Sequence, residues 1–475
     1  MTTRAAGPYI GGKHREAKTK VEIRSPYDSS LVGEVGLGDE RDLEAAIAGA
    51  AAAFQAWSRS ATHERALTLE KLASSIEAEQ AALASLICRE SGKPIRYARA
   101  EVARAAATFR LGAAEARVLG GEVLPSDQLP GAEGRLTLFR RVPRGPVAGI
   151  SPFNFPLNLV AHKLAPALAV GAPLVLKPAP QAPLTAHRLA ELATAAGAPP
   201  HAFDVLHLRP EVAERLATDP RLPVLSFTGS DAVGWHLQSV AKRKHVLLEL
   251  GGNAPCLIDE TVDLEALLPR VVDASFANAG QVCIKAQRLF VVRQRFDEFL
   301  ERFVALTRAL PVGDPTDERT VVGPLIEPRH VTRVLEWVAE ATRGGAQLLS
   351  GGRADGNVVA PVVLTGTSPE QRVCKDEVFG PVTVVEPVDS FEAGLAACNA
   401  SRFGIQASVF TRDLGRALVA FRELEFPGVL INDAPTFRVD NVPYGGVRDS
   451  GTGREGVRFA IEEFTEPKLL SLRDV

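Results

Sequence analysis

The first 120 residues carry a helical pattern of apolar side chains. Between residues 40 and 57 apolar positions recur at intervals of three to four, which places them on one face of a helix, and Asp39 stands where it can cap that helix. The same spacing predicts a second helix over 63–89, which stops at the Gly and Pro of Ser91–Pro94, and a third over 95–119. The amino-terminal quarter of the chain is therefore expected to be mainly helical.

From residue 147 onward the pattern changes to short apolar runs that alternate with helical segments. The first set predicts strands at 173–176, 203–208, 223–227 and 245–250, with helices at 184–196, 211–218 and 231–242. The second set predicts strands near 289–292, 359–364, 382–385, 407–410 and 428–431, with helices near 296–310, 329–343 and 414–424. Such alternation implies parallel, doubly wound sheets. We therefore expect an α/β fold with two domains that are divided near residue 250.

Residues 126–144 lie between these two regions and follow neither pattern. Polar and apolar side chains alternate from Arg135 to Arg140, which is typical of an exposed strand. We expect a β-hairpin here that extends away from the body of the protein.

Composition and charge exclude several classes of protein. The 475 residues include 54 Lys plus Arg and 57 Asp plus Glu, a formal net charge of −3, so no excess of positive charge favours nucleic acid or an anionic membrane. No run reaches the ~18 apolar residues that span a bilayer, and residues 1–7 lack the apolar core of a signal peptide. We expect no nucleic-acid partner and no membrane segment.

The cysteines and histidines make a disulfide framework or a metal site unexpected. The five cysteines lie far apart without a CxxC pair, and the nine histidines show no HxxxH spacing. This usage favours a reducing compartment, and we expect a cytoplasmic protein in which an individual thiol can be reactive.

Cys283 is the candidate nucleophile. It follows a helix-like run (264–276) and the loop Asn278–Val282, in which Gly280 lets backbone approach closely. A thiol beside free backbone N–H groups can ionise and attack an electrophilic carbon. Taken alone, a packed and unreactive thiol fits the pattern better.

Two further residues have settings suited to the same chemistry. Glu249 ends an apolar strand, where burial would raise its pKa towards the range of a general base; an exposed carboxylate at the sheet edge is the alternative. Asn154 lies in a loop fixed by Pro152 and Pro156, so its amide can be oriented as an oxyanion hole requires. An Asx turn would also explain it.

Possible cofactor contacts occur at two strand ends. Lys177 ends a strand before Pro178, so its ammonium group can reach a ribose hydroxyl, although a solvated lysine is also consistent. Phe227–Ser230 joins a strand to a helix whose first N–H groups can hold phosphate. Gly451–Gly456 matches GxGxxG, but it lacks the preceding strand and the later acidic residue of a dinucleotide fingerprint.

Taken together, these motifs resemble those of the aldehyde dehydrogenase superfamily, and they occur in the family's order across nearly the whole chain. The matching segments are Ser151–Pro156, Leu176–Pro178, Phe227–Ser230, Glu249–Gly252, Gly280–Cys283, Val312–Pro315, Gly323–Ile326, Glu377–Pro381 and Pro443–Gly456. Residues 432–446 look most like lactaldehyde, non-phosphorylating glyceraldehyde-phosphate and phosphonoacetaldehyde dehydrogenases.

The resemblance implies roles for the catalytic candidates. Cys283 would be the nucleophile, and Asn154 with the Cys283 backbone N–H would form the oxyanion hole. Glu249 would activate the water that releases the product. Lys163 and Glu466 match a Lys and a Glu that form a proton relay with the general base in some members.

The resemblance also implies the cofactor, the domains and the assembly. Contacts with NAD or NADP are expected from Ile150, Ser151, Pro152, Phe153, Lys177, Pro180, Gly229, Ser230, Val233, Leu250, Glu377 and Phe379, with Glu377 contacting the ribose. A Rossmann-like cofactor domain would comprise 1–124 and 146–250, an α/β catalytic domain 251–446, and a β-hairpin oligomerisation arm 125–145 and 457–475. Family members are usually homodimers or homotetramers.

The expected reaction is oxidation of an aldehyde to the carboxylic acid with NAD(P), through a thiohemiacetal and a thioester on cysteine. A CoA-acylating enzyme on the same fold is the alternative, disfavoured because its general-base Glu is often absent and Glu249 is present. A non-catalytic scaffold protein is a remoter alternative, disfavoured because Cys283, Glu249, Asn154 and Lys177 are all intact.

Departures from the family pattern concern the cofactor and the substrate. Pro180 stands where many NAD-preferring members have Glu, so the choice of NAD or NADP stays open. Val282 and Ile284 flank the nucleophile, where some members for phosphorylated aldehydes carry Arg before the Cys. Arg104 and Arg438 could still recruit an anionic aldehyde, although salt bridges would equally explain them.

Overall fold

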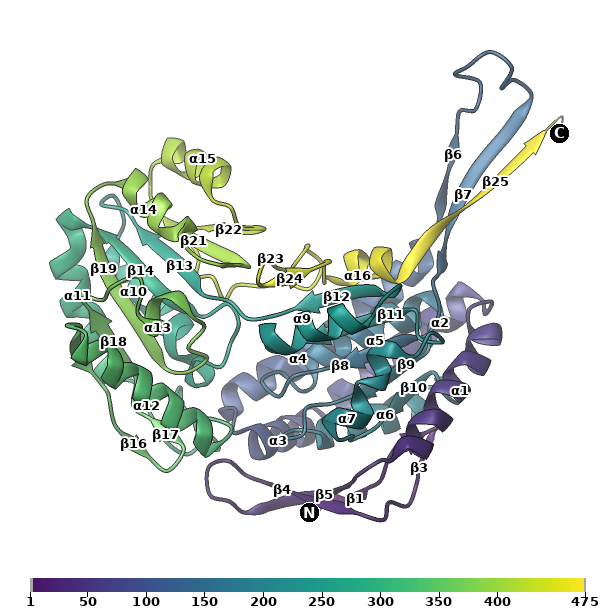
Figure 1. Cartoon of the computed structure of the whole chain (residues 1–475), viewed down its shortest axis with the longest axis horizontal. Coiled ribbons are helices and arrows are strands. Elements are labelled where there is room, and N and C mark those ends of the chain that lie inside the picture. The colour runs from purple at the N-terminus through teal and green to yellow at the C-terminus, as the bar shows by residue number, and fades with distance from the viewer. Residues whose placement is uncertain (1–2, 474–475) are drawn as a thin grey trace.

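A computed structural model describes residues 3–473 of the chain. Figure 1 shows two α/β bodies, formed around one large sheet each, and a long β-arm that projects from one of them and includes the carboxy-terminal strand. No helix within the described residues is both long enough and apolar enough to cross a membrane.

The first body is built on an eight-stranded sheet. Its order is β24-β12-β11-β8-β9-β10-β2-β3. The strands are β2 (Tyr9–Ile10), β3 (Lys13–His14), β8 (Val147–Ile150), β9 (Leu174–Lys177), β10 (Phe203–Val205), β11 (Val224–Thr228), β12 (His245–Glu249) and β24 (Gly451–Thr452). The five strands from β8 to β12 run parallel, and short antiparallel strands complete both edges.

Helices cover both faces of this sheet, as the alternation of strands and helices predicts. They are α1 (Glu40–Trp57), α2 (Thr62–Ala78), α3 (Gln80–Ser91), α4 (Ile95–Val118), α5 (Asn158–Val170), α6 (Leu184–Ala195), α7 (Pro210–Ala213), α8 (Arg215–Thr218) and α9 (Asp231–Val240). Successive strand residues point to opposite faces. Leu174 and Leu176 accordingly pack with α2 to α6, whereas Val175 packs with α1, α8 and α9.

The second body is built on a seven-stranded sheet of order β15-β18-β19-β14-β13-β21-β22. Its strands are β13 (Ala254–Ile258), β14 (Ala286–Val292), β15 (Gln347–Ser350), β18 (Val362–Thr365), β19 (Val382–Val388), β21 (Gln406–Phe410) and β22 (Gly428–Ile431). Only β15 is antiparallel to its neighbour. Its helices are α10 (Leu264–Phe276), α11 (Arg293–Arg308), α12 (Pro328–Arg343), α13 (Arg372–Lys375), α14 (Phe391–Asn399) and α15 (Leu414–Glu423).

Smaller elements complete the fold. A three-stranded sheet near the amino terminus joins β1 (Thr3–Ala6), β5 (Leu31–Gly36) and β4 (Lys20–Arg24), and two short pairs join β16 (Ala354–Asp355) with β17 (Val358–Val359) and β20 (Phe403–Gly404) with β23 (Val447–Arg448). A 3₁₀ turn, η1 (Ala277–Gly280), follows α10.

The arm is a three-stranded antiparallel sheet in which β7 (Arg135–Pro143) lies between β6 (Gly121–Leu124) and β25 (Thr465–Arg473). The arm therefore begins at Gly121, earlier than the expected residue 125. The expected carboxy-terminal boundary at 457 also differs, because α16 (Val457–Phe464) does not belong to the arm. Its apolar face, with Val457, Ile461 and Phe464, packs into the core of the first body.

The helical predictions differ from the structure in three places. Residues 3–36, within the region expected to be helical, form the strands β1 to β5 instead. The predicted helix 40–57 is α1, and Asp39 caps it by accepting hydrogen bonds from the N–H groups of Arg41 and Asp42. The predicted helix 63–89 is two helices, α2 and α3, because the backbone leaves the helical conformation at Glu79. The predicted helix 211–218 is likewise two single turns, α7 and α8.

Candidate active site

Several predicted residues meet at the carboxyl ends of the parallel strands of the first body. Ile150, Lys177 and Glu249 are the last residues of β8, β9 and β12, and the strands are paired so that Ile150 lies opposite Lys177. Glu249 lies opposite Thr228, the last residue of β11. Ligands of open α/β sheets bind at this edge. Cys283 comes from the second body, between η1 and β14.

The loop that carries Cys283 has an unusual backbone. Asn278, Ala279 and Gly280 all adopt left-handed conformations, with φ of 53°, 56° and 67°, and such strain at non-glycine residues clusters at functional sites. Gln281, which sequence reasoning passed over, holds the loop. Its side-chain Nε2 donates to the Asn278 carbonyl at 3.3 Å, and its Oε1 accepts from the Ile326 N–H at 3.0 Å.

Asn154 is fixed against this loop. Its Nδ2 donates a hydrogen bond to the Gln281 carbonyl oxygen at 2.9 Å, and only 5% of the residue is exposed. A side-chain amide carries two N–H groups. One therefore orients Asn154, and the second remains for a substrate oxygen beside Cys283.

A buried ion pair supports the Asn154 loop, and sequence reasoning did not find it. The Lys93 ammonium donates to Glu101 at 2.5 Å and lies 3.5 Å from the centre of the Phe155 ring. Glu101 in turn accepts from the N–H groups of Leu157 and Asn158, at the beginning of α5. Both charged side chains are fully buried, so removal of either one would leave the other as an unpaired buried charge.

Cys283 is half-buried and its Sγ lies 3.1 Å from the hydroxyl of Tyr444. Burial raises the pKa of the thiol to about 12; the Tyr444 hydrogen bond lowers it, whereas the charges of Glu377 and Glu249 raise it further. The thiol is therefore protonated at neutral pH in the free protein and needs a proton acceptor before it can attack.

Apolar side chains surround the nucleophile. Ile284 and Ile405 are buried and pack with Tyr444, and Val282 is half-buried against them. The predicted substrate residues Val282 and Ile284 are thus brought to Cys283.

Glu249 supplies a carboxyl group close to the thiol. Burial, reinforced by the negative charge of Glu455, raises the pKa of Glu249 well above its ordinary value. Its Oε1 atom makes no hydrogen bond to any described residue. A raised pKa and an unpaired buried oxygen suit a general base that alternates between protonation states.

The glycines after Glu249 allow the loop that contains them to pack closely against the Cys283 loop and against Glu377. A Cβ atom at Gly252 would lie 2.1 Å from the Cys283 carbonyl oxygen, and one at Gly251 would lie 2.5 Å from Glu377 Oε2. Any side chain here would push the nucleophile loop or Glu377 away.

Of the two residues predicted to form a proton relay with Glu249, the structure places Lys163 near it and Glu466 away from it. Lys163 is fully buried and donates to Thr228 at 2.7 Å and to Ser226 at 3.0 Å, and its ammonium lies 3.6 Å from Glu455 Oε1. Glu466, the predicted partner, is exposed on β25 and pairs with Arg144 at 3.1 Å, because this strand leaves the body to join the arm.

Glu455 occupies the place expected of Glu466. It is buried, and the charges of Lys163, His162 and Arg438 hold its pKa below its ordinary value despite that burial. It lies between the last two glycines of the GxGxxG segment, whose strand β24 pairs with β12 beside Glu249. The sequence signal that could have identified Glu455 is that it is the acidic residue of the glycine-rich segment Gly451–Gly456.

Arg104 and Arg438 are both engaged by carboxylates. Arg438, with a side chain 7% exposed, lies 3.0 Å from Glu455 and 3.7 Å from Asp440. Arg104 pairs with Asp440 at 2.7 Å, and His162 accepts or donates there at 3.0 Å. The geometry favours the salt-bridge interpretation of both arginines over recruitment of an anion.

The other strand ends form a surface suited to a dinucleotide. Burial lowers the pKa of Lys177 to about 8. No carboxylate among residues 3–473 pairs with its ammonium group to oppose this shift. Burial likewise raises the pKa of Glu377 to about 7, and its Oε1 accepts from the Gly252 N–H at 2.9 Å. Phe379, at φ 43°, meets the Phe153 ring edge-on at 5.9 Å.

The remaining predicted cofactor residues lie around this surface. Gly229 and Ser230 immediately precede α9, and the Ser230 side chain makes no capping hydrogen bond. The Ala232 N–H is bonded to the Asp231 carboxylate, which leaves those of Asp231 and Val233 for a phosphate. Val233 is exposed on α9, Leu250 is buried beneath that helix against Gly234, and Ser151 is buried. Pro152 is half-buried and Pro180 is exposed. NAD or NADP fits this set of groups: the unpaired ammonium of Lys177, the buried carboxyl of Glu377 and the N-terminus of α9.

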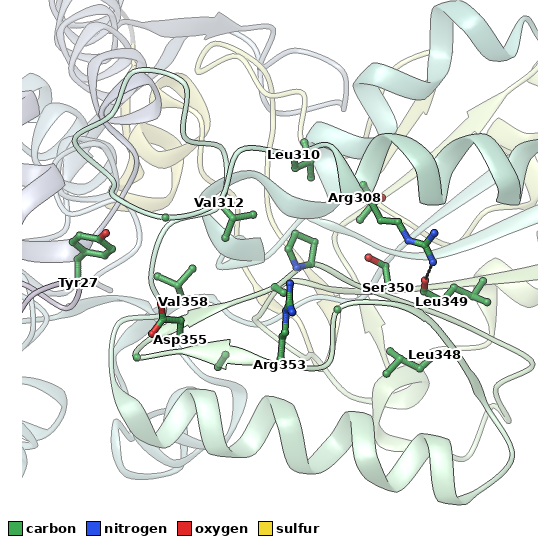
Figure 2. A pocket seen from close by; sticks show the side chains of 17 residues that line it. Tyr27, Arg308, Leu310, Val312, Leu348, Leu349, Ser350, Arg353, Asp355 and Val358 are labelled. Atoms are coloured by element: carbon green, nitrogen blue, oxygen red, sulfur yellow. Dashed lines mark hydrogen bonds between the residues drawn. The ribbon is translucent and has the colours of Figure 1, made fainter.

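A separate cavity of about 940 Å³ is lined mainly by residues of the second body, with Tyr27 of the amino-terminal segment at one end (Figure 2). Arg308 reaches the Leu349 carbonyl across its wall at 2.6 Å, and Arg353 and Asp355 line its rim. None of the predicted site residues lines this cavity.

The fold and the cysteine site together define a class of protein. The sequence profile described as "Aldehyde dehydrogenase family" matches residues 13–470, and the chain belongs to this family. A 3-sulfolactaldehyde dehydrogenase from Priestia aryabhattai is 39% identical over 467 residues, covering 98% of both chains. A lactaldehyde dehydrogenase from Methanococcus vannielii is 34% identical over 464 residues, covering 96% of this chain and 97% of the relative.

Solved structures agree with this assignment. Aldehyde dehydrogenase 21 from Physcomitrella patens, in complex with the reaction product succinate, superimposes with a TM-score of 0.98 at 38% identity, covering 100% of this chain and 99% of that one. The NADP-dependent glyceraldehyde-3-phosphate dehydrogenase from Bacillus halodurans, complexed with NADP, gives a TM-score of 0.96 at 32% identity, covering 99% and 100%.

Proposed function

We propose that this aldehyde dehydrogenase acts through Cys283 on a small aldehyde that carries a hydroxyl or an anionic group, with NAD or NADP as oxidant. The observation that carries the proposal is the convergence of three groups from separate elements. The Cys283 thiol, the free amide N–H of Asn154 and the unpaired carboxyl of Glu249 meet where the two bodies join.

Acylation begins when the Cys283 thiol gives its proton to Glu249, directly or through water. The thiolate attacks the aldehyde carbon, the C=O π bond breaks, and a thiohemiacetal oxyanion forms. Asn154 and the Cys283 backbone N–H donate hydrogen bonds to that oxygen, and such donors stabilise the charge as it develops.

The bound NAD(P) supplies a hydride acceptor. Lys177 and Glu377 would hold its ribose hydroxyls, and the start of α9 would hold its phosphates. Phe153 and Phe379 form an aromatic wall that fixes position and excludes water.

Deacylation uses Glu249 a second time, after the proton taken from Cys283 has passed from its carboxyl group to solvent. As a base it removes a proton from water, which attacks the thioester and releases the acid and the Cys283 thiolate. Lys163 and Glu455 lie beside Glu249, and their opposite charges regulate how readily it releases the proton.

The side chains that pack around Cys283 support a short aldehyde with a polar substituent. Val282, Ile284 and Ile405 leave apolar walls, and the Tyr444 hydroxyl is the polar group among them. The relatives named for 3-sulfolactaldehyde and lactaldehyde support a short, hydroxylated aldehyde, with or without an anionic end.

One experiment tests the proposal directly. Short-chain aldehydes with and without hydroxyl, carboxylate, sulfonate or phosphate groups are supplied with NAD or NADP, and NAD(P)H formation is followed. Cys283→Ala should abolish it, and Cys374→Ala, which changes a half-buried thiol elsewhere, should not. Activity that survives Cys283→Ala would sink the proposal, and a strict requirement for CoA would favour the acylating alternative.

We also propose that the protein is a cytoplasmic homodimer or homotetramer assembled through the arm. Apolar side chains are exposed on both faces of this thin sheet, notably Val123 at 69%, Leu469 at 63% and Leu470 at 46%. Apolar patches of this kind mark protein contacts. The edge strand β22 and the exposed Leu414 and Phe421 of α15 offer a matching surface on a second copy. A reducing compartment keeps Cys283 free.

A further inference from the structure

Tyr444 touches the reacting sulfur and has no role in the reaction as proposed above. It lies in the loop before β23, its side chain is 5% exposed, and its hydroxyl oxygen is 3.1 Å from Cys283 Sγ. The other members of its cluster, Ile284, Ile405 and Val282, are apolar, and the nearby Glu249 and Glu377 disfavour a negative charge on sulfur. The hydroxyl is therefore the side-chain group placed to compensate a negative charge on sulfur before substrate arrives.

The direction of this hydrogen bond follows from the two groups. Burial and the nearby Cys283 raise the pKa of Tyr444 well above its ordinary value, so the hydroxyl keeps its proton throughout the working pH range. A thiolate carries no proton and only accepts. Once Cys283 ionises, the Tyr444 O–H must be the donor, and hydrogen bonds to charged groups are the strong ones.

Arg438 holds the tyrosine in this position. Its guanidinium carbon lies 3.7 Å from the centre of the Tyr444 ring, on the ring face. The guanidinium is itself fixed by Glu455 at 3.0 Å and by Asp440 at 3.7 Å. A planar cation stacked on a buried ring restricts the ring's tilt and hence the direction of its hydroxyl.

We propose that Tyr444 is a further catalytic residue, which donates a hydrogen bond to the Cys283 thiolate, and that Arg438 is its positioning residue. The proposal rests on the role of Cys283 as nucleophile. It gives Arg438, which is paired with Glu455 and Asp440, a function other than the recruitment of an anionic substrate.

The step balances without a further reactant. The thiol proton leaves to Glu249, and the sulfur becomes negative while Tyr444 donates to it. When the sulfur–carbon bond forms, the charge moves to the substrate oxygen, which Asn154 receives. Tyr444 is never deprotonated, and its hydroxyl is then free to contact a polar substituent beside the aldehyde carbon.

The test measures how fast iodoacetamide alkylates Cys283 in the full-length protein, by mass spectrometry of its peptide, between pH 7 and 10. Tyr444→Phe keeps the ring and removes only the hydroxyl. We expect alkylation about tenfold or more slower at each pH, because a charge-assisted hydrogen bond is lost. Tyr9→Phe, which removes a hydroxyl bonded to Thr194 far from the site, should match the wild type.

Coincident profiles for wild type and Tyr444→Phe would overturn the proposal. That result is distinct from failure of the proposed function, which would appear as dehydrogenase activity retained in Cys283→Ala. An equal melting temperature for Tyr444→Phe and wild type shows that the lost rate is not a folding defect.

Arg438→Lys tests the positioning role, because it keeps the charge and loses the planar stack. Alone, it should slow alkylation in the same direction as Tyr444→Phe. In the Tyr444→Phe background it should slow alkylation little further, since the hydrogen bond that it directs is already gone. Equal slowing in both backgrounds would show that Arg438 acts on the thiol independently of the tyrosine.

Discussion

The side-chain amide of Asn154 is bonded to the carbonyl oxygen of Gln281, 2.9 Å away, two residues before the nucleophile. A loop of the first body is thereby tied to the cysteine loop of the second. The amide is oriented by the backbone that carries Cys283, so donor and nucleophile keep their relative position when the loops move.

Asn154→Ala should lower kcat by about a hundredfold to a thousandfold, the usual effect of losing one oxyanion donor. Steady-state kinetics with a short aldehyde measure it. Asn399→Ala removes an amide that bonds the Glu423 carbonyl away from the site, and it should leave kcat unchanged. A smaller loss for Asn154→Ala than for Asn399→Ala would refute the assignment.

Glu249→Gln should separate the two halves of the reaction. Gln can neither accept the Cys283 proton nor activate water, so the variant should give a slowed burst of about one NAD(P)H per active site and then a still slower steady rate. Stopped-flow absorbance at 340 nm, the wavelength at which the reduced cofactor absorbs, records both phases. A steady rate equal to that of the wild type would show that another group activates the water.

Glu455 and Glu466 should respond differently to the same substitution. Glu455→Gln leaves Lys163 without a carboxylate and Arg438 with Asp440 alone, and breaking such a buried pair costs about 3–5 kcal/mol, so activity and stability should both fall. Glu466→Gln removes a half-exposed partner of Arg144, worth less than about 1 kcal/mol. Kinetics and urea unfolding compare them; the reverse order of effects would restore Glu466 to the relay.

Cofactor affinity should weaken as pH rises through about 8. Burial has lowered the pKa of Lys177 to about 8, so its ammonium form predominates below that pH. This charged form is the one that a ribose oxygen or a 2′-phosphate attracts. Above that pH the Lys177 amine is mostly neutral, so cofactor binding must be accompanied by uptake of a proton. Calorimetric titration with NAD and NADP from pH 6.5 to 9.5 tests this, and Lys177→Met should bind more weakly with little dependence on pH.

The arm should control assembly. Leu469→Lys places a charge on its apolar surface, which is 63% exposed at this residue, and should shift the protein to monomers in sedimentation velocity. Leu67→Lys alters a leucine that is 47% exposed on α2 and serves as the control. Unchanged sedimentation of Leu469→Lys would place the interface elsewhere.

Local patterns predicted most of the parallel strands, because each is an apolar run bounded by turns, but they missed β8, β13 and the buried helix α5. The break between α2 and α3 at Glu79 was missed, since neither Gly nor Pro marks it. The exchange of Glu466 for Glu455 has another cause. Both acids lie in the last 25 residues, and only tertiary structure decides which one turns inward and which one continues into the arm.

Long-range pairs were also beyond a reading of the sequence. Lys93 looked like part of a helix stop, but it forms a buried ion pair with Glu101 that supports the Asn154 loop. Gln281 lies in the nucleophile motif, yet its contacts with Pro324 and Ile326 require the folded second body. Motifs predicted the candidate reacting groups, whereas the residues that hold them emerge only in three dimensions.

The segment 443–456 also constrains how the enzyme can be made. It contributes Tyr444 beside the nucleophile, Glu455 beside Lys163, and the strand β24 that closes the edge of the first sheet. Tyr444 follows Cys283 by 161 residues, so a nascent chain exposes its thiol long before the groups that control it are synthesised. A chain truncated before this segment would keep the Cys283 thiol and lack Tyr444, Glu455 and β24, so we expect it to be inactive.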